Sequence, residues 1–142
     1  MFRKDYMVRQ IEEFGKVLAA LMNLRKNNDL PVFEKEIREA LSRFTGMELS
    51  FVKSLTHDEL RHYLSHSVQL HNDQLKILAD LLWEDYLANE AQFEAEKEQL
   101  LKILSLYDMY QHALTQNEFN LEVHYKMSTI RNLLGINPPS RQ

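Results

Sequence analysis

The stretch NDQLKILADLLWEDYLAN, residues 72–89, decides the fold class. At helical spacing its main apolar face consists of Leu75, Leu78, Ala79, Leu82 and Tyr86. Four more apolar side chains point in other directions: Ile77, Leu81, Trp83 and Leu87. A helix that is apolar most of the way round lies between neighbours. The stretch is therefore predicted to be a helix, capped at Asn72, that packs against other helices on more than one side.

Amphipathic helices are predicted on both sides of this stretch because apolar side chains recur every three or four residues. They cover about residues 5–28, 31–45, 92–116 and 118–134. Asp5 and Asp29 are the expected N-caps of the first two, and Pro31 fits the first turn of the second. Gly46 and Gly135 are placed to end two helices in the left-handed conformation.

The least regular part of the chain is residues 47–71, between the second helix and the apolar one. Thr56 and Glu59 have the spacing of a capping box, which predicts a short helix from there to about His66. Ser50 is expected to open a short helical turn. We interpret this part as a connector.

Composition agrees with a helical fold and argues against a β-sandwich or barrel. The chain has 142 residues, 44% of them apolar, with three Gly and three Pro. So few turn residues do not suit many short strands. The sequence thus predicts an all-α fold of five to six helices, arranged as antiparallel hairpins in a short solenoid or bundle. Residues 1–135 are expected to form one domain and residues 136–142, with Pro138 and Pro139, a short tail.

Two segments carry a likeness to a known repeat family. Leu78-x3-Leu82-x3-Tyr86, followed by Phe93 and Ala95, resembles part of a tetratricopeptide repeat. The first hairpin resembles another, with Leu18-Ala19-x2-Met22 and then Phe33-x3-Ile37-x2-Ala40-Leu41. Trp83 and Ala19 stand where the repeat has Gly, and the Pro at the end of the repeat is missing from both. The arrangement of nearly the whole chain resembles a small bacterial family of tetratricopeptide-like proteins of unknown function, including the opening Phe-Arg-Lys-Asp-Tyr-Met (residues 2–7) and the connector Gly-Met-Glu-Leu (residues 46–49). That resemblance implies stacked helix hairpins and no particular activity.

Charge and composition exclude several classes of partner. The net charge is −4, and residues 46–100 carry 11 acidic against 4 basic side chains. No segment has the basic excess that a nucleic-acid backbone requires. The longest apolar run, 17–22, has six residues, far below the roughly 18 that span a bilayer. Without cysteine, thiolate chemistry and disulfides are absent, and a cytoplasmic protein is expected.

Histidines supply the one suggestive cluster of chemical groups. His62 and His66 are four residues apart, so both rings can reach one ion from the same helix, and Glu59 adds a carboxylate. This spacing is the basis of an alternative function, a metal-binding protein or metal-assisted enzyme. Two histidines alone are one ligand short of a catalytic zinc site. The favoured interpretation is two histidines that face solvent, with no bound metal.

Other reactive patterns point the same way. The carboxylates of Asp80 and Glu84 lie four residues apart and are expected to be exposed. The charged first half of the helix at about 92–116, which includes Glu98 and Lys102, is also expected to face water. Glycine at 15, 46 and 135 alone leaves no phosphate-binding loop or nucleophile elbow. We therefore expect no catalytic activity and no cofactor.

The remaining hypothesis is an interaction module. The helices around residues 75–87 and 100–114 have more apolar surface than the few other elements can cover, and large exposed apolar patches mark interfaces. The partner is expected to be a protein or peptide, or a second copy of the chain. The side chains expected to contact it are Trp83, Leu106, Tyr107 and Met109.

Overall fold

The computed structural model of the chain describes residues 2–68, 70–89, 93–114 and 119–136, with the side chains of residues 2–4 and 93–95 left out. Within these ranges the chain is all-helical and has no strand. The helices are α1 (Phe2–Lys26), α2 (Leu30–Thr45), α3 (Leu49–Ser54), α4 (His57–His66), α5 (Asn72–Ala88), α6 (Phe93–Ala113) and α7 (Leu121–Leu134). The prediction of an all-α fold is confirmed. Of the tail expected at residues 136–142, residues 137–142 lie outside the described residues.

The described part has more helices than the five to six expected. The turn predicted at Ser50 is a six-residue helix of its own, α3, and α4 follows it after two residues. Both belong to the segment interpreted as a connector. The connector is thus helical too.

Several predicted helix ends are confirmed by their capping contacts. The Thr56 hydroxyl accepts from the backbone N–H of Glu59, and the Glu59 carboxylate accepts from the backbone N–H of Thr56. Gly46 and Gly135 end α2 and α7 with φ angles of 72° and 76°, a conformation that glycine adopts without steric cost.

Three predicted N-caps differ in the structure. α1 begins at Phe2, so Asp5 lies in its first turn, where a carboxylate favours the positive end of the helix dipole. Asp29 precedes α2 as expected, but its side chain makes no capping hydrogen bond. His71, rather than Asn72, caps α5: its ring accepts from the N–H of Asp73, and Gln74 accepts from the N–H of His71.

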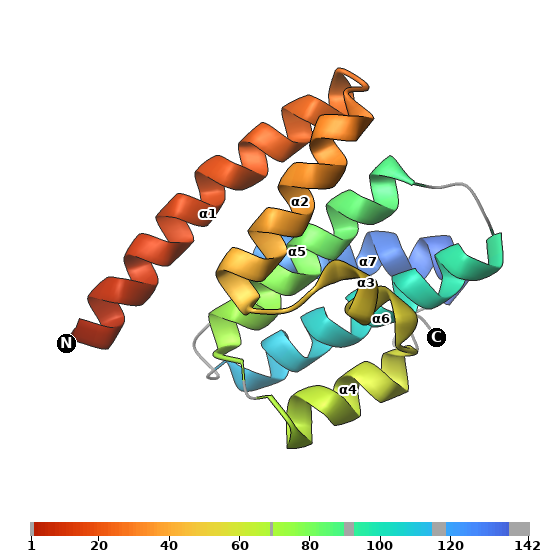
Figure 1. Cartoon of the computed structure of the whole chain (residues 1–142). Helices are drawn as coiled ribbons and strands as arrows, with labels where there is room; N and C mark the ends of the chain where they lie inside the picture. Colours follow the sequence, from red (N-terminus) through yellow and green to blue (C-terminus); the bar gives the residue numbers. More distant parts are fainter. Residues whose placement is uncertain (1, 69, 90–92, 115–118, 137–142) are drawn as a thin grey trace.

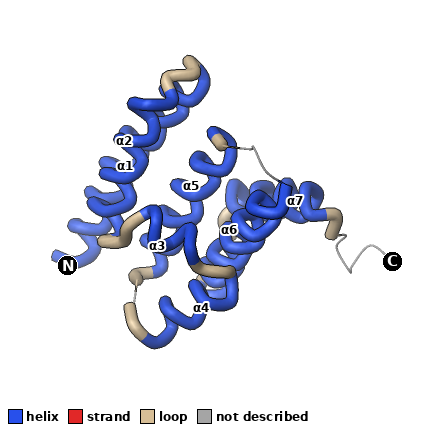
Figure 2. The backbone as a smooth tube through the Cα atoms, turned by 45° about the vertical axis from the view of Figure 1, so that its right-hand side comes forward, coloured by secondary structure: helices blue, strands red, loops and turns tan. Residues whose placement is uncertain are grey.

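α5 is the central helix. It packs against the α1–α2 hairpin on one side and α6 on the other, and α6 in turn packs against α4 and α7 (Figure 1). Viewed from another side, α5 again lies between the α1–α2 pair and the α6–α7 pair (Figure 2). The predicted position of this helix between neighbours is confirmed.

Contacts near the helix ends establish the directions in which the helices run. Gln74, at the start of α5, donates to the carbonyl oxygen of Phe44, at the end of α2, so these two helices are antiparallel. Lys76 near the start of α5 pairs with Glu122 near the start of α7, and the C-terminal ends of both helices line one hollow. α5 and α7 therefore run in the same direction. α1 runs alongside α5 in the same direction, and the ion pair of Arg25 with Glu84 joins their C-terminal ends (Figure 1).

The core is continuous through all seven helices. Its fully buried large side chains include Phe33, Leu78, Ile103, Tyr107 and Leu60. No described helix has an apolar stretch long enough to cross a bilayer.

Candidate functional site

Carboxylates on α5 are buried, which corrects the expectation that Asp80 and Glu84 face solvent. Asp80 is 1% exposed. Its Oδ2 atom lies 2.9 Å from Nζ of Lys76, its Oδ1 atom lies 3.1 Å from Nζ of Lys126, and Oδ1 also accepts from the Tyr107 hydroxyl. The group joins α5, α6 and α7 through one buried acid.

The pKa values of this group follow from its surroundings. Burial raises the pKa of the Tyr107 hydroxyl well above its usual value, and the negative charge of Asp80 adds to the effect. Burial alone would lower the pKa of Lys76, but the charge of Asp80 and their hydrogen bond outweigh it and raise that pKa. The hydroxyl therefore stays protonated and the ammonium charged, so the contacts persist at neutral pH.

Two further buried acids of α5 also have basic partners on other helices. Glu84 lies 2.7 Å from Arg25 of α1, and Asp85 lies 3.2 Å from Lys53 of α3. Burial raises the pKa of Asp85, and Lys53 counteracts part of that rise. Each acid holds a different neighbouring helix against α5. These carboxylates act as tertiary contacts.

Lys102 corrects the expectation that its part of α6 faces water. The side chain is fully buried, and its Nζ donates to the carbonyl oxygens of Val52 at 2.9 Å and Lys53 at 3.1 Å. These carbonyls lie in the last turn of α3, and the Val52 carbonyl also accepts from the backbone N–H of Leu55. Burial lowers the pKa of Lys102 to about 8.

The predicted metal ligands do not converge as a set of three. The rings of His62 and His66 stack with centroids 4.1 Å apart on the exposed side of α4, but Glu59 uses its carboxylate to cap the same helix at Thr56. Among the described residues, no three histidine or acidic side chains are grouped so as to hold an ion. His57, the first residue of the same helix, contacts Glu98 of α6, with Nδ1 and Oε1 2.8 Å apart.

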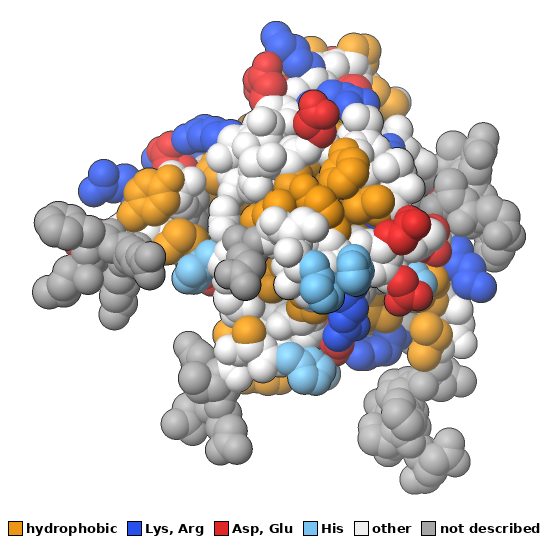
Figure 3. Space-filling model, turned by 60° about the horizontal axis from the view of Figure 1, so that its bottom comes forward, with side chains coloured by type: hydrophobic (Ala, Val, Ile, Leu, Met, Phe, Trp, Pro, Cys, Tyr) orange, Lys and Arg blue, Asp and Glu red, His pale blue; other side chains and the backbone are white. Residues whose placement is uncertain are grey.

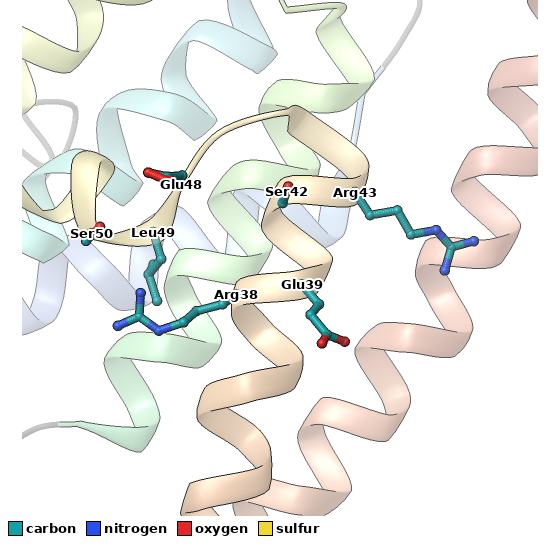
Figure 4. Close-up of a pocket in the computed structure, with 7 residues that line it drawn as sticks. All are labelled: Arg38, Glu39, Ser42, Arg43, Glu48, Leu49 and Ser50. Carbon is teal, nitrogen blue, oxygen red and sulfur yellow. The ribbon is translucent and has the colours of Figure 1, made fainter.

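A surface hollow of about 440 Å³ lies between α2 and α3 and has mixed charge. Its arginines are already engaged, Arg38 with Glu34 and Arg43 with Glu13. The side chain of Arg38 extends to one side of α2, and those of Glu39 and Arg43 extend to the other (Figure 4). The hollow therefore has no set of polar groups directed at one ligand.

A second hollow, about 320 Å³, is bordered mainly by uncharged side chains where α2, α3 and α4 meet. It is lined by Thr45, Gly46, Met47, Glu48, Phe51, Tyr63 and Val68. The Phe51 and Tyr63 rings meet edge to face, 5.1 Å apart, and Phe51 is 39% exposed. A space-filling view from this side shows apolar side chains gathered on the surface next to histidines (Figure 3). We take this apolar hollow as the candidate functional site.

The four side chains predicted to contact a partner are less exposed than expected. Leu106 and Tyr107 are 1% and 0% exposed, so neither belongs to the uncovered surface. Trp83 and Met109 are partly buried against the core. α6 has more neighbours than expected, because α4 and α7 both pack on it and cover its apolar side chains.

The residues of the apolar hollow were missed because they lie in the connector. Met47, Phe51, Tyr63 and Val68 belong to three short segments whose apolar side chains meet only in the folded chain. The sequence did contain a signal: Phe51 is a large aromatic side chain next to Ser50, where a short helical turn was expected. Such a side chain indicates packing or binding.

No family model, no curated protein and no solved structure matches the chain. The case for its function therefore rests on the geometry of the hollow and of the helix stack.

Proposed function

We propose that the protein is a helical interaction module without catalytic activity, which binds an apolar segment of a partner protein or peptide in the hollow between α2, α3 and α4. The observation that carries this proposal is the partly exposed aromatic pair of Phe51 and Tyr63 at the edge of that hollow. Its volume, about 320 Å³, is near the lower end of the roughly 300–1,000 Å³ of ligand pockets. It suits one or two large side chains of a partner.

The arrangement of the helices supports a tetratricopeptide-like architecture as part of the same proposal. α1, α5 and α7 run in one direction, with α2 antiparallel to α5, as in stacked helix hairpins. The α1–α2 and α5–α6 hairpins then correspond to two repeats, α7 to a further first helix, and α3–α4 to an insertion between repeats. The hollow belongs to this insertion.

The roles of the buried charged groups also favour a binding module over an enzyme. Asp80, Glu84 and Asp85 each pair with a basic side chain of another element or turn, and Lys102 binds backbone carbonyls. These are contacts between helices. They give a firm scaffold behind a surface hollow whose lining is mostly apolar.

The experiment that tests the proposal places a photo-crosslinking amino acid at Phe51 in the full chain and identifies the crosslinked peptides from native cells by mass spectrometry. The control carries the same group at Val32, which is 44% exposed and lies on the first turn of α2. We expect an apolar peptide crosslinked at position 51, absent at position 32 and lost with the Tyr63→Asp variant. Equal crosslinking at both positions contradicts the proposal.

A further inference from the structure

The outward side of α7 lacks the charged residues that normally face water. The helix buries Val123, Met127 and Ile130. On the opposite side a line at intervals of four residues consists of Leu121, Tyr125, Thr129 and Leu133, all exposed. Tyr125 is 63% exposed, and Leu121 and Leu133 are each 54% exposed. The line contains no charge, while Glu122 and Lys126 at its edge pair with each other.

The helices at the other end of the stack differ from α7. The outer faces of α1 and α2 mix charged with apolar side chains. The exposed charged residues include Arg9, Glu12, Lys16, Lys35 and Glu39, and the large exposed apolar ones are Tyr6, Val8, Ile11, Leu30 and Val32. Such charged outer faces are what the end of a helix stack needs in water. Since α7 lacks them, its outward face is suited to contact with another surface.

Head-to-tail stacking of copies does not suit the different outer faces of α7 and of the α1–α2 pair. It would press the uncharged line of α7 against charged side chains of α1 and α2, which would lose water without gaining partners. A contact between two α7 helices brings together surfaces of the same chemistry. It also closes after two copies, because each copy uses the same patch.

The pattern along α7 is self-complementary when two copies run antiparallel. With Met127 at the centre, Leu121 of one copy is opposite Leu133 of the other, and Tyr125 is opposite Thr129. Phe119 and Ile136, also exposed, extend the apolar patch at its two ends. Leucine thus meets leucine on both sides of the central pair.

The area of this patch reaches the lower limit for a specific contact between two copies. Its large apolar residues, roughly 150–250 Å² each, expose about half of their surface, so one copy offers about 500 Å². Two copies together bury about 1,000 Å², the lower limit for a specific interface. We infer that a second copy of this chain covers the outward face of α7 in an antiparallel α7–α7 contact.

The first test is the mass of the full chain in solution, by sedimentation equilibrium over a range of concentrations. We expect twice the 16.9 kDa of one chain for the wild type and a dissociation constant at least about 100-fold larger for Leu121→Glu/Tyr125→Glu. The control Tyr6→Glu/Ile11→Glu changes two exposed apolar residues of α1 and should leave the dimer intact. Circular dichroism checks that each variant is folded.

The second test reads the register through disulfide formation, since the chain has no cysteine of its own. Leu121→Cys and Leu133→Cys are prepared separately and oxidised alone and as a mixture. In the antiparallel pair, like positions lie about 18 Å apart along the helix axis, so only the mixture should crosslink. A monomeric wild type, a dimer that persists in the Leu121→Glu/Tyr125→Glu variant, or crosslinking of either cysteine variant alone overturns the inference.

Discussion

The Nζ atom of Lys102 in α6 lies 2.9 Å from the carbonyl oxygen of Val52, in the last turn of α3. A six-residue helix has little stability of its own, because forming the first turn costs more than the few later hydrogen bonds return. The buried ammonium group of Lys102 donates to two carbonyl oxygens at the end of α3 and so attaches α3 to α6. The wall of the apolar hollow that α3 forms therefore depends on a side chain outside the hollow.

The stability of the protein should consequently rise with pH above neutrality through Lys102. Burial lowers its pKa from 10.5 to about 8, so between these values the unfolded chain binds more protons than the folded chain. Relative to Lys102→Met, the wild type should gain about 2 kcal/mol in free energy of unfolding between pH 7.5 and 9.5. Urea unfolding of both proteins at the two pH values measures this gain. A difference that does not change with pH contradicts the prediction.

Removing the buried carboxylate at the centre of α5 should be strongly destabilising. Asp80→Asn leaves Lys76 and Lys126 without their buried counter-charge, and losing one partner of such a pair costs about 3–5 kcal/mol. Tyr107→Phe removes one hydrogen bond to the carboxylate and should cost about 1.5–3 kcal/mol. Urea unfolding measures both.

The matched control for these variants is Glu36→Gln, at an exposed position of α2, which should change stability by less than about 0.5 kcal/mol. Because Asp80 and Tyr107 are in contact, the double variant should lose less than the sum of the two single losses. Additive losses would show that the two side chains do not act as one group.

The docking of α4 on α6 should weaken in acid. Glu98 accepts from the backbone N–H of His57 at 2.5 Å and contacts its ring. Burial works to raise the pKa of Glu98, but the hydrogen bonds from His57 outweigh it and lower that pKa. A carboxylate with a lowered pKa stabilises the folded chain above its unfolded pKa, and this effect is lost as pH falls through the folded value.

Glu98→Gln should therefore speed the hydrogen exchange of α4 amides at pH 7 and remove the extra loss of protection that the wild type undergoes on acidification. Glu96→Gln, on the same helix, serves as the control, and mass spectrometry of peptides from residues 57–66 is the measurement. Equal exchange of α4 in the wild type and Glu98→Gln would contradict the role of this contact.

The sequence sufficed to predict helices because their apolar spacing and caps are local signals. Thr56 with Glu59, Gly46 and Gly135 are confirmed at the expected ends. The partner of each charged side chain could not be predicted from the sequence of its own helix. Asp80 and Lys102 look exposed on their own helices, yet their partners Lys126 and Val52 come from elements 46 and 50 residues away.

The burial of the acidic side chains of α5 could have been predicted from the sequence. A helix predicted to be covered on several sides, such as α5, has little free surface for its polar residues. Asp80, Glu84 and Asp85 were therefore candidates for buried ion pairs from the same pattern that predicted a covered helix. The apolar hollow is a different case, because Met47, Phe51 and Tyr63 meet only through the packing of three short segments.

Zinc tests the alternative function that the histidines of α4 suggested. Glu59 is engaged with Thr56, and His66 directs its Nδ1 toward the carbonyl oxygen of His62, 3.0 Å away. Each imidazole ring can bind an ion through one nitrogen, so the two histidines supply two ligands at most, fewer than a stable zinc site uses. We expect zinc to leave the melting temperature of the wild type, of His62→Ala/His66→Ala and of the control His112→Ala unchanged. Zinc at 100 times the dissociation constant of a site would add about 2.7 kcal/mol to the free energy of unfolding. A rise of several degrees in melting temperature that only the double variant loses would therefore restore the metal-binding hypothesis.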